Sequence, residues 1–245
     1  MSKTKSEALR IVHRCATEYQ KNLVNKNVLF VSLNNNKAEL FEVSFLPRSF
    51  LHLTGIRTQL KSTTFYAMAL RDRVREQDIT LADDGTTDKK LDVLQSLMNI
   101  QVTARMLGDY DHSQRLLVTD KLAGTVTSAM GFRRDGDYYM PNTSLKTDMR
   151  TITKKPVQRI AAIFVKGFND EKYSKLTYIA KGLSVDDDIF IPVMSEKVDK
   201  NNLNIAFPTP PPTLQERLSE AKKKADEHNN SERGNVSKDK NEPSI

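Results

Sequence analysis

The sequence predicts an α+β fold, in which N-terminal helices and a hairpin come first, further strands follow, and a polar tail ends the chain. Three changes along the 245 residues indicate this order. Outside the hairpin, apolar residues recur every three or four positions up to Gly108, as in amphipathic helices. After Gly108 they recur every second position, as in half-buried strands. From Phe207 onwards prolines and charged residues replace them.

The composition shift at Phe207 predicts two regions. Residues 1–206 are expected to form a single α+β domain, because they contain nearly all of the periodic apolar positions. Residues 207–245 begin with a proline-rich spacer, which favours a stiff extended chain. The rest of this region lacks apolar anchors, so we expect a polar, largely disordered tail.

A helix and a hairpin are predicted at the N-terminus. Residues 6–23 carry apolar side chains at helical spacing, and Ser6 can cap their start. Residues 27–33 and 38–45 have the pattern of two strands, and the asparagines at 34–36 favour the left-handed angles of a tight turn.

Two further helices are expected at residues 62–75 and 89–107, with Gly108 as the C-cap of the second. Before them, the segment FLHLTGI at 50–56 predicts a junction between a loop and a helix. Its His52 can donate or accept a proton near neutral pH. A hydrogen-bonded core histidine would fit the same spacing, and spacing alone leaves both interpretations open.

The part of the chain after Gly108 predicts a sheet. Residues 159–166, RIAAIFVK, are almost continuously apolar and indicate a central strand. Residues 173–181 are expected to pair back against it, with Tyr173, Lys175, Thr177 and Lys181 on one face. Other strands are expected at residues 116–118, 125–133, 138–140 and, at an edge, 189–193.

Residues 119–150 combine a strand pattern with several turn signals. Asp135-Gly136 predicts a tight hairpin turn, because glycine accepts a positive φ at low cost. Pro141 cannot donate to a ladder and is expected to end the returning strand. Asn142, Thr143 or Ser144 would then cap a short helix that carries Lys146 and Arg150. An ordinary meander with solvated basic side chains would produce the same pattern.

Charge and composition limit the classes of function. The net charge of +7 favours an anionic partner, and nucleic acid is the commonest kind. Cys15 is the only cysteine, which excludes an intrachain disulfide and fits a reducing cytoplasm. No apolar run is long enough for a membrane span. The N-terminal residues lack the apolar core of a secretory signal.

Several enzyme classes lack their motifs in this sequence. It contains no glycine-rich phosphate loop, no dinucleotide fingerprint and no paired-histidine zinc helix. Asp109, Asp111 and His112 could bind a divalent cation, but we expect a solvated turn there. We therefore expect neither a metal nor an organic cofactor.

Cleavage of RNA without a metal needs only common side chains. A base must take the proton of the 2′-hydroxyl group, and an acid must protonate the leaving 5′-oxygen. Cations must stabilise the crowded phosphorane. Residues of these types are His52, Lys121, Arg150, Lys175 and Lys181.

The segments FLHLTGI, TDKLAGTVTSAMGF, YMPNTSLKTDMR and KYSKLTYIAKG together resemble the phage barnase–EndoU–colicin–RelE-like nuclease domains, in the fourth group of that set. These domains occur in mobile elements of Firmicutes. The resemblance covers residues 6–193. It implies an α+β fold in which helices precede a curved antiparallel sheet that carries the active site. It also implies a metal-independent ribonuclease-like activity.

The resemblance assigns residues as well. His52 falls on the histidine of the HLTG-like segment, and Lys121 falls in the TDK segment. Arg150 follows the PNT-containing segment, and Lys181 belongs to the terminal lysine-glycine pair. We predict His52, Lys121, Arg150 and Lys181 as the catalytic group, with His52 as acid or base. Substrate binding is predicted for Lys175, Thr177 and Tyr173.

Three functions remain open at this point. The first is a metal-independent ribonuclease-like protein of a mobile element, whose partner is nucleic acid, RNA in the first place. Such a protein would need an immunity or antitoxin partner if it acts as a toxin. The second is a non-catalytic nucleic-acid-binding accessory protein of a mobile element. The third is a protein-interaction module that uses the proline-rich spacer and the tail as a ligand.

Overall fold

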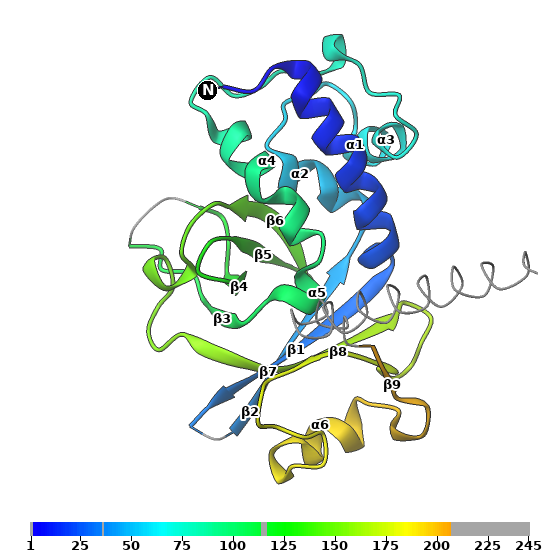
Figure 1. Cartoon of the computed structure of the whole chain (residues 1–245), viewed down its shortest axis with the longest axis vertical. Coiled ribbons are helices and arrows are strands. Elements are labelled where there is room, and N and C mark those ends of the chain that lie inside the picture. The colour runs from blue at the N-terminus through cyan, green and yellow to red at the C-terminus, as the bar shows by residue number, and fades with distance from the viewer. Residues whose placement is uncertain (1, 36, 114–116, 207–245) are drawn as a thin grey trace, which may run out of the picture. The chain divides into compact units, whose positions relative to one another are not determined.

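The structure, a computed structural model, describes residues 2–35, 37–113 and 117–206 (Figure 1). Its helices are α1 (Lys5–Asn22), α2 (Phe50–Thr54), α3 (Ser62–Ala69), α4 (Thr86–Leu97), α5 (Ile100–Thr103) and α6 (Ile191–Glu196). Its strands are β1 (Lys26–Asn34), β2 (Lys37–Phe45), β3 (Met106–Asp109), β4 (Lys121–Gly124), β5 (Ala129–Asp135), β6 (Tyr138–Leu145), β7 (Gln158–Gly167), β8 (Lys175–Ile179) and β9 (Asn204–Ile205). Helices dominate the first half and strands the second, which confirms the predicted α+β class.

All nine described strands belong to one sheet, in the order β1-β2-β6-β5-β4-β3-β7-β8-β9. Strand β1 also pairs with β7, so the seven strands from β1 round to β7 form a closed circuit. Most neighbours are antiparallel, as expected. The β2–β6 and β8–β9 pairs are parallel, so the sheet is mixed.

Strand β7 is the predicted central strand, and its pairing confirms that position. It pairs with β1 along one edge. Along the other edge it pairs first with β3 and then with β8. Ile160, Ile163 and Phe164 are fully buried, because packed elements cover both faces of the strand. The predicted strand at 173–181 is confirmed as β8, which is shorter than expected.

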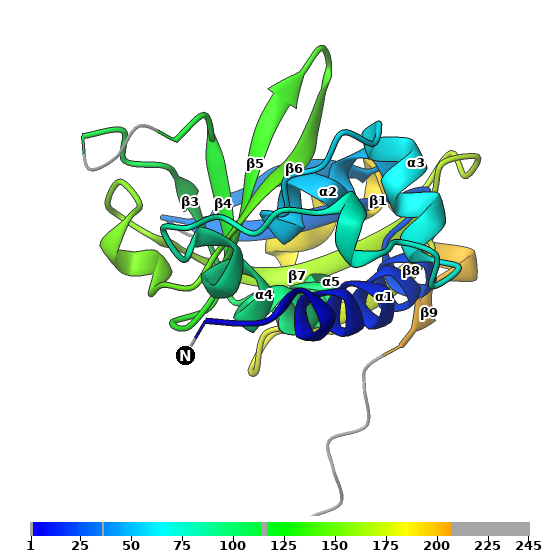
Figure 2. The same ribbon diagram turned by 90° about the horizontal axis from the view of Figure 1, so that it is seen from above.

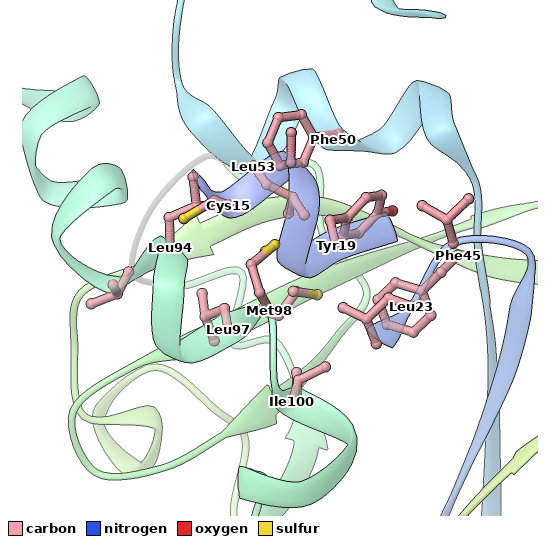
Figure 3. Close-up of a cluster of buried hydrophobic side chains, with 14 of the residues drawn as sticks. Cys15, Tyr19, Leu23, Phe45, Phe50, Leu53, Leu94, Leu97, Met98 and Ile100 are labelled. Atoms are coloured by element: carbon pink, nitrogen blue, oxygen red, sulfur yellow. The ribbon is translucent and has the colours of Figure 1, made fainter. Parts of the chain in front are cut away.

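Helix α1 packs its apolar stripe on the main core. It begins after Thr4 rather than at the predicted cap Ser6, because the side chains of Thr4 and Glu7 each accept a hydrogen bond from the other's backbone N–H. Figure 3 shows Cys15 and Tyr19 among apolar side chains of α2, α4 and β2. Burial raises the pKa of the Cys15 thiol to about 12, so this cysteine is a small core residue.

Helix α6 packs on a second apolar cluster together with β1, β7 and β8. The predicted edge strand at 189–193 is therefore wrong. Phe190, Val193 and Met194 are buried at helical spacing, and Pro192 stands in the first turn, where its missing N–H costs nothing.

Both predicted helices between the hairpin and Gly108 are shorter than expected. Helix α3 ends at Ala69, and Asp72 adopts a positive φ of 54° in the turn after it. The segment at 89–107 divides into α4, α5 and the start of β3. Gly108 lies within β3 and is not a C-cap. The chain leaves the helix after Thr103, because the backbone of Arg105 pairs with two strands instead. Its N–H donates to the backbone oxygen of Gly124, and its oxygen accepts from the N–H of Ile160.

The predicted strand at 125–133 is in fact a turn followed by β5. The side chain of Thr125 accepts from the backbone N–H of Thr127 and Ser128, which stabilises the turn. Val126 is half exposed there. A Cβ at Gly124 would lie 2.2 Å from the carbonyl oxygen of Ser128, so the tight turn requires glycine. The strand expected at 116–118 is absent at Leu117 and Val118, and residue 116 lies outside the described residues.

The hairpin turn at Asp135-Gly136 is confirmed, with Gly136 at φ 63°. Pro141 does not end the returning strand, since β6 continues to Leu145. The proline lies next to a register shift, and past Tyr139 no described strand pairs with the other edge of β6. There its missing N–H costs no ladder bond.

The short helix predicted after Pro141 is also wrong. Asn142, Thr143 and Ser144 belong to β6, and a single 3₁₀ turn at Met149–Thr151 carries Arg150. The predicted spacer and tail at 207–245 lie outside the described residues, so the boundary at 206 stays a prediction. Strand β9 was not predicted.

Candidate active site

Helix α2 positions His52, and the FLHLTGI sequence explains why. Phe50 and Leu53 lie one turn apart and are fully buried. Gly55 ends the helix in the left-handed conformation, at φ 69°. A Cβ at Gly55 would also lie 2.7 Å from Cδ of Lys90. The apolar side chains thus anchor this helix, while the side chain of His52 is exposed on its other side.

His52 lines a cavity of about 430 Å³, here called the His52 cavity. Its opposite wall comes from the β5–β6 hairpin, which projects from the body of the sheet in Figure 2. This hairpin contributes Arg133 and Arg134, and Arg48 comes from the turn before α2. The other lining residues are Ser49, Ser62, Asp135, Met140, Pro141 and Asn142.

The charges of the His52 cavity favour an anion. Of the described residues that line it, three are arginines and one is an acid, Asp135. That acid pairs with Arg48, with 2.8 Å between the guanidinium and carboxylate atoms. Arg134 donates through Nε to the backbone oxygen of Gly136 at 3.1 Å. Arg133 has no ion pair among the described residues, so its charge is available to a ligand.

Burial lowers the pKa of His52 below that of an ordinary histidine, and the nearby charge of Lys90 lowers it further. Lys90 Nζ donates to the backbone oxygen of His52 at 3.0 Å, which explains their proximity. A lowered pKa keeps the imidazole neutral at pH 7. A neutral imidazole can accept a proton, so His52 suits the role of a general base.

Lys121, predicted as catalytic, lies on β4 and does not line the His52 cavity. Its Nζ lies 2.5 Å from Oδ1 of Asp109, its cross-strand partner on β3. Lys121 Nζ also lies 5.8 Å from the centre of the Phe41 ring. The structure therefore places Lys121 in an ion pair, one strand away from the hairpin strand that carries Arg133.

Arg150 and Lys181 lie on other surfaces. Arg150 forms a bidentate ion pair with Asp148, with 2.6 Å between the closest atoms. This ion pair raises the pKa of Arg150. Lys181 is exposed in the turn after β8, where its backbone oxygen accepts from Arg159. Neither side chain lines the His52 cavity, so the structure does not bring the four predicted catalytic residues together.

The residues predicted to bind substrate belong to β8 and its approach. Thr177 is buried, and its hydroxyl donates to the backbone oxygen of Gln101 at 2.5 Å. Tyr173 is buried in the cluster beneath α6, and burial raises the pKa of its phenol. Lys175 is exposed and lines a separate cavity of about 320 Å³, here called the β8 cavity. The other lysines that line the β8 cavity are Lys21, Lys26 and Lys166.

Sequence reasoning did not single out the three arginines of the His52 cavity. One signal for two of them was present, because Arg133 and Arg134 directly precede the Asp135-Gly136 turn. A correct hairpin prediction therefore places both near its tip. No comparable signal marks Arg48, which reaches the cavity through the fold of the chain around Pro47.

No group of three or more histidine, cysteine, aspartate or glutamate side chains in the described part of the chain is placed to hold a metal ion, and this includes Asp109, Asp111 and His112. None of the described helices combines the length and the apolar character that crossing a membrane requires.

Comparison with known proteins identifies the family. No curated protein and no solved structure matches the chain. The sequence profile of one family does match, over residues 11–182. This range includes α2, the β5–β6 hairpin and β7, and therefore every residue that lines the His52 cavity. The chain thus belongs to the phage-Barnase-EndoU-ColicinE5/D-RelE like nuclease 4 family.

Proposed function

We propose that the protein is a metal-independent ribonuclease whose reaction takes place in the His52 cavity. The observation that carries the proposal is an exposed imidazole of lowered pKa that shares one cavity with three arginines. The nuclease family supports nucleic acid as the substrate. A base and cations are sufficient for cleavage when the substrate supplies its own nucleophile, and the 2′-hydroxyl group of RNA does so.

In this proposal neutral His52 takes the proton of the 2′-hydroxyl group. The 2′-oxygen forms a bond to phosphorus, and the bond between phosphorus and the 5′-oxygen breaks. Arg133 and Arg134 stabilise the negative charge of the phosphorane. The products are a 2′,3′-cyclic phosphate and a strand with a 5′-hydroxyl group. Water supplies the proton to the leaving oxygen, because no second histidine is among the described residues that line the cavity.

We propose that the predicted basic residues outside the His52 cavity contact RNA that flanks the cleaved bond. Lys175 lies with three other lysines in the β8 cavity and could hold a phosphate there. Lys121, Arg150 and Lys181 remain predictions for phosphate contacts outside the His52 cavity. For Thr177 and Tyr173, burial favours a structural role over direct contact with the substrate.

The proposal includes a biological setting. The family description names phage, which supports an origin in a mobile genetic element. A ribonuclease of this origin that acts in the cytoplasm would damage its host. It would therefore act together with an immunity or antitoxin protein that neutralises it.

The test is cleavage by the purified full chain in the presence of a chelator. Mixed RNAs should be cut and should carry 2′,3′-cyclic phosphate ends. The variant His52→Ala should lose cleavage by about 10²–10⁴-fold, the range for removal of a general base. The matched control is His112→Ala, which removes another exposed histidine and should cleave like the parent. Full activity of a folded His52→Ala protein would contradict the proposal.

A second function has an observation in its favour. The predicted cations Arg150 and Lys181 do not line the His52 cavity, and the described residues of the β8 cavity include four lysines and no histidine. These features suit a non-catalytic nucleic-acid-binding protein. In the same assay, binding that weakens steeply with salt, with no cleavage, would favour that function. The protein-interaction alternative depends on residues 207–245, outside the described residues, and stays a prediction.

A further inference from the structure

A second cavity lies next to the His52 cavity, between α4 and the end of β6, with a volume of about 530 Å³. We call it the α4–β6 cavity. Its floor is apolar, because the side chains there belong to or pack on a small separate cluster of the core. These floor residues are Tyr110, Leu117, Leu145 and Ile152. The rest of the lining, here called the rim, consists of lysines and hydroxyl groups, and the hydroxyl groups of Thr143 and Ser144 are buried. The cavity therefore combines apolar side chains with positive charge.

The lysines of this rim are Lys89, Lys90 and Lys146. Lys146 pairs with Asp92 at 2.8 Å, but the carboxylate of Asp92 also pairs with Lys3. Lys90 is partly buried and donates to the backbone oxygen of His52. Lys89 is exposed and has no ion pair among the described residues. Since no acid is among the described residues that line the cavity, positive charge is in excess.

The α4–β6 cavity continues the His52 cavity along one strand. Residues 140–142 of β6 line the His52 cavity, and residues 143–145 of the same strand, with Lys146 after it, line the second one. The distance from Pro141 to Leu145 along an extended strand is about 13 Å. Helix α2 and Lys90 connect the two cavities on the other side. Between the cavities α2 packs on β6, where the Ser144 hydroxyl donates to the backbone oxygen of Leu53. A short single strand that passes over the exposed side of α2, beside His52 and Lys90, would therefore reach both.

We infer that the α4–β6 cavity binds one nucleotide of the RNA strand that is cleaved in the His52 cavity, an inference that rests on the proposed ribonuclease function. The base would lie on the apolar floor, and its phosphate would contact Lys89 and Lys146. Inorganic phosphate alone would not use the apolar floor, and an uncharged apolar ligand would not use the lysines. A nucleotide uses both, because it joins a flat ring to an anion.

Binding of the four nucleoside 5′-monophosphates to the full chain tests the subsite directly, by calorimetry and with inorganic phosphate and the four nucleosides as probes. At least one nucleotide should bind more tightly than either inorganic phosphate or its own nucleoside. The double variant Lys89→Ala/Lys146→Ala should weaken that binding at least tenfold, while Lys197→Ala, an exposed lysine after α6, should not. Equal binding of phosphate and nucleotides, or unchanged binding by the double variant, would overturn the inference.

Cleavage kinetics separate this inference from the proposed function. The double variant should cleave a dinucleotide substrate as the parent does, but its kcat/KM for a hexanucleotide should fall about tenfold. An equal loss on both substrates would overturn the subsite and leave the ribonuclease in place. If the parent cleaves no RNA while lysine-dependent nucleotide binding persists, the ribonuclease proposal fails and nucleotide binding at this cavity stands. Circular dichroism confirms that each variant is folded.

Discussion

The His52 cavity and the β8 cavity are both cationic hollows of similar volume, about 430 and 320 Å³. They differ in the side chains that supply the charge. The β8 cavity holds lysines, and the pKa of Lys26 there is lowered by burial and by the neighbouring charge of Lys175. The His52 cavity adds an imidazole that is neutral at pH 7. In the proposed function either cavity would hold a phosphate, and among the described residues that line the two cavities we assign the acceptance of a proton to His52.

The largest expected difference between the two cavities concerns the arginines. Arg133→Ala should lower kcat by about 10²-fold, because removal of one donor to a developing oxyanion costs about 10²–10³-fold. Lys175→Ala, the matched change in the β8 cavity, should leave kcat unchanged and raise KM only. Single-turnover cleavage of RNA measures both. Equal losses of kcat would mean that the two cavities contribute to chemistry alike.

The acid limb of the pH–rate profile gives the next test. If neutral His52 is the base, activity persists down to its lowered pKa, so the limb should lie below the ordinary histidine value of about 6.5. Lys90→Met keeps the length of the side chain and removes its charge. It should raise the pKa of His52 and move the limb to higher pH, while Lys175→Met should not. An unmoved limb in Lys90→Met would show that Lys90 does not act on the base.

A smaller effect is expected for Thr177, the buried hydroxyl beside the β8 cavity. Thr177→Val should lower the free energy of unfolding by about 1 kcal/mol, because the hydrogen bond to Gln101 is lost. Cleavage should be unchanged at a temperature where the variant is folded. Thermal unfolding and RNA cleavage measure the two effects. A large loss of cleavage without a loss of stability would restore Thr177 to the substrate-binding group.

The smallest effect concerns the salt dependence of RNA binding. If Lys175 holds one phosphate, Lys175→Ala should reduce the slope of log K against log salt by about 0.7, the value for one contact on a single strand. Fluorescence anisotropy with a labelled RNA measures the slope for parent and variant. An unchanged slope would mean that the β8 cavity does not hold the strand, and the difference between the cavities would then be one of binding as well as chemistry.

Local patterns predicted most of the scaffold. The first helix and the β1–β2 hairpin depend on spacing and turn residues within a few positions, and the Asp135-Gly136 turn does so too. The errors arose where distant contacts decide the outcome. Gly108 resembles a C-cap, but pairing of β3 with β4 and β7 places it in a strand. Pro141 resembles a strand end, yet it is tolerated at an edge where no described strand pairs with β6.

The candidate site was less predictable, because convergence is a property of the tertiary fold. His52 could be chosen from its type and its segment. Lys121 and Arg150 also had the right type, but each is held by a neighbouring carboxylate, Asp109 and Asp148. Asp109 and Lys121 lie on separate strands, and sequence spacing gives no information about such a pair. Asp148 stands two residues before Arg150, so that pair was visible in the sequence. Spacing likewise could not show that Arg48 and Arg133 line the same cavity.

In the seven-stranded circuit the shortest strand pairing is the one between β2 and β6, where Val43 and Tyr139 are the one residue pair of the ladder. The hairpin that carries Arg133 and Arg134 is attached to the first hairpin at this contact. Amide protons on both sides of it should exchange with solvent sooner than those of β7, because a single residue pair forms the ladder there. Side chains still pack across the contact, since the ring centres of Phe41 and Tyr139 lie 4.9 Å apart. In the proposed site, opening of the circuit at this contact would change the space between the arginines and His52.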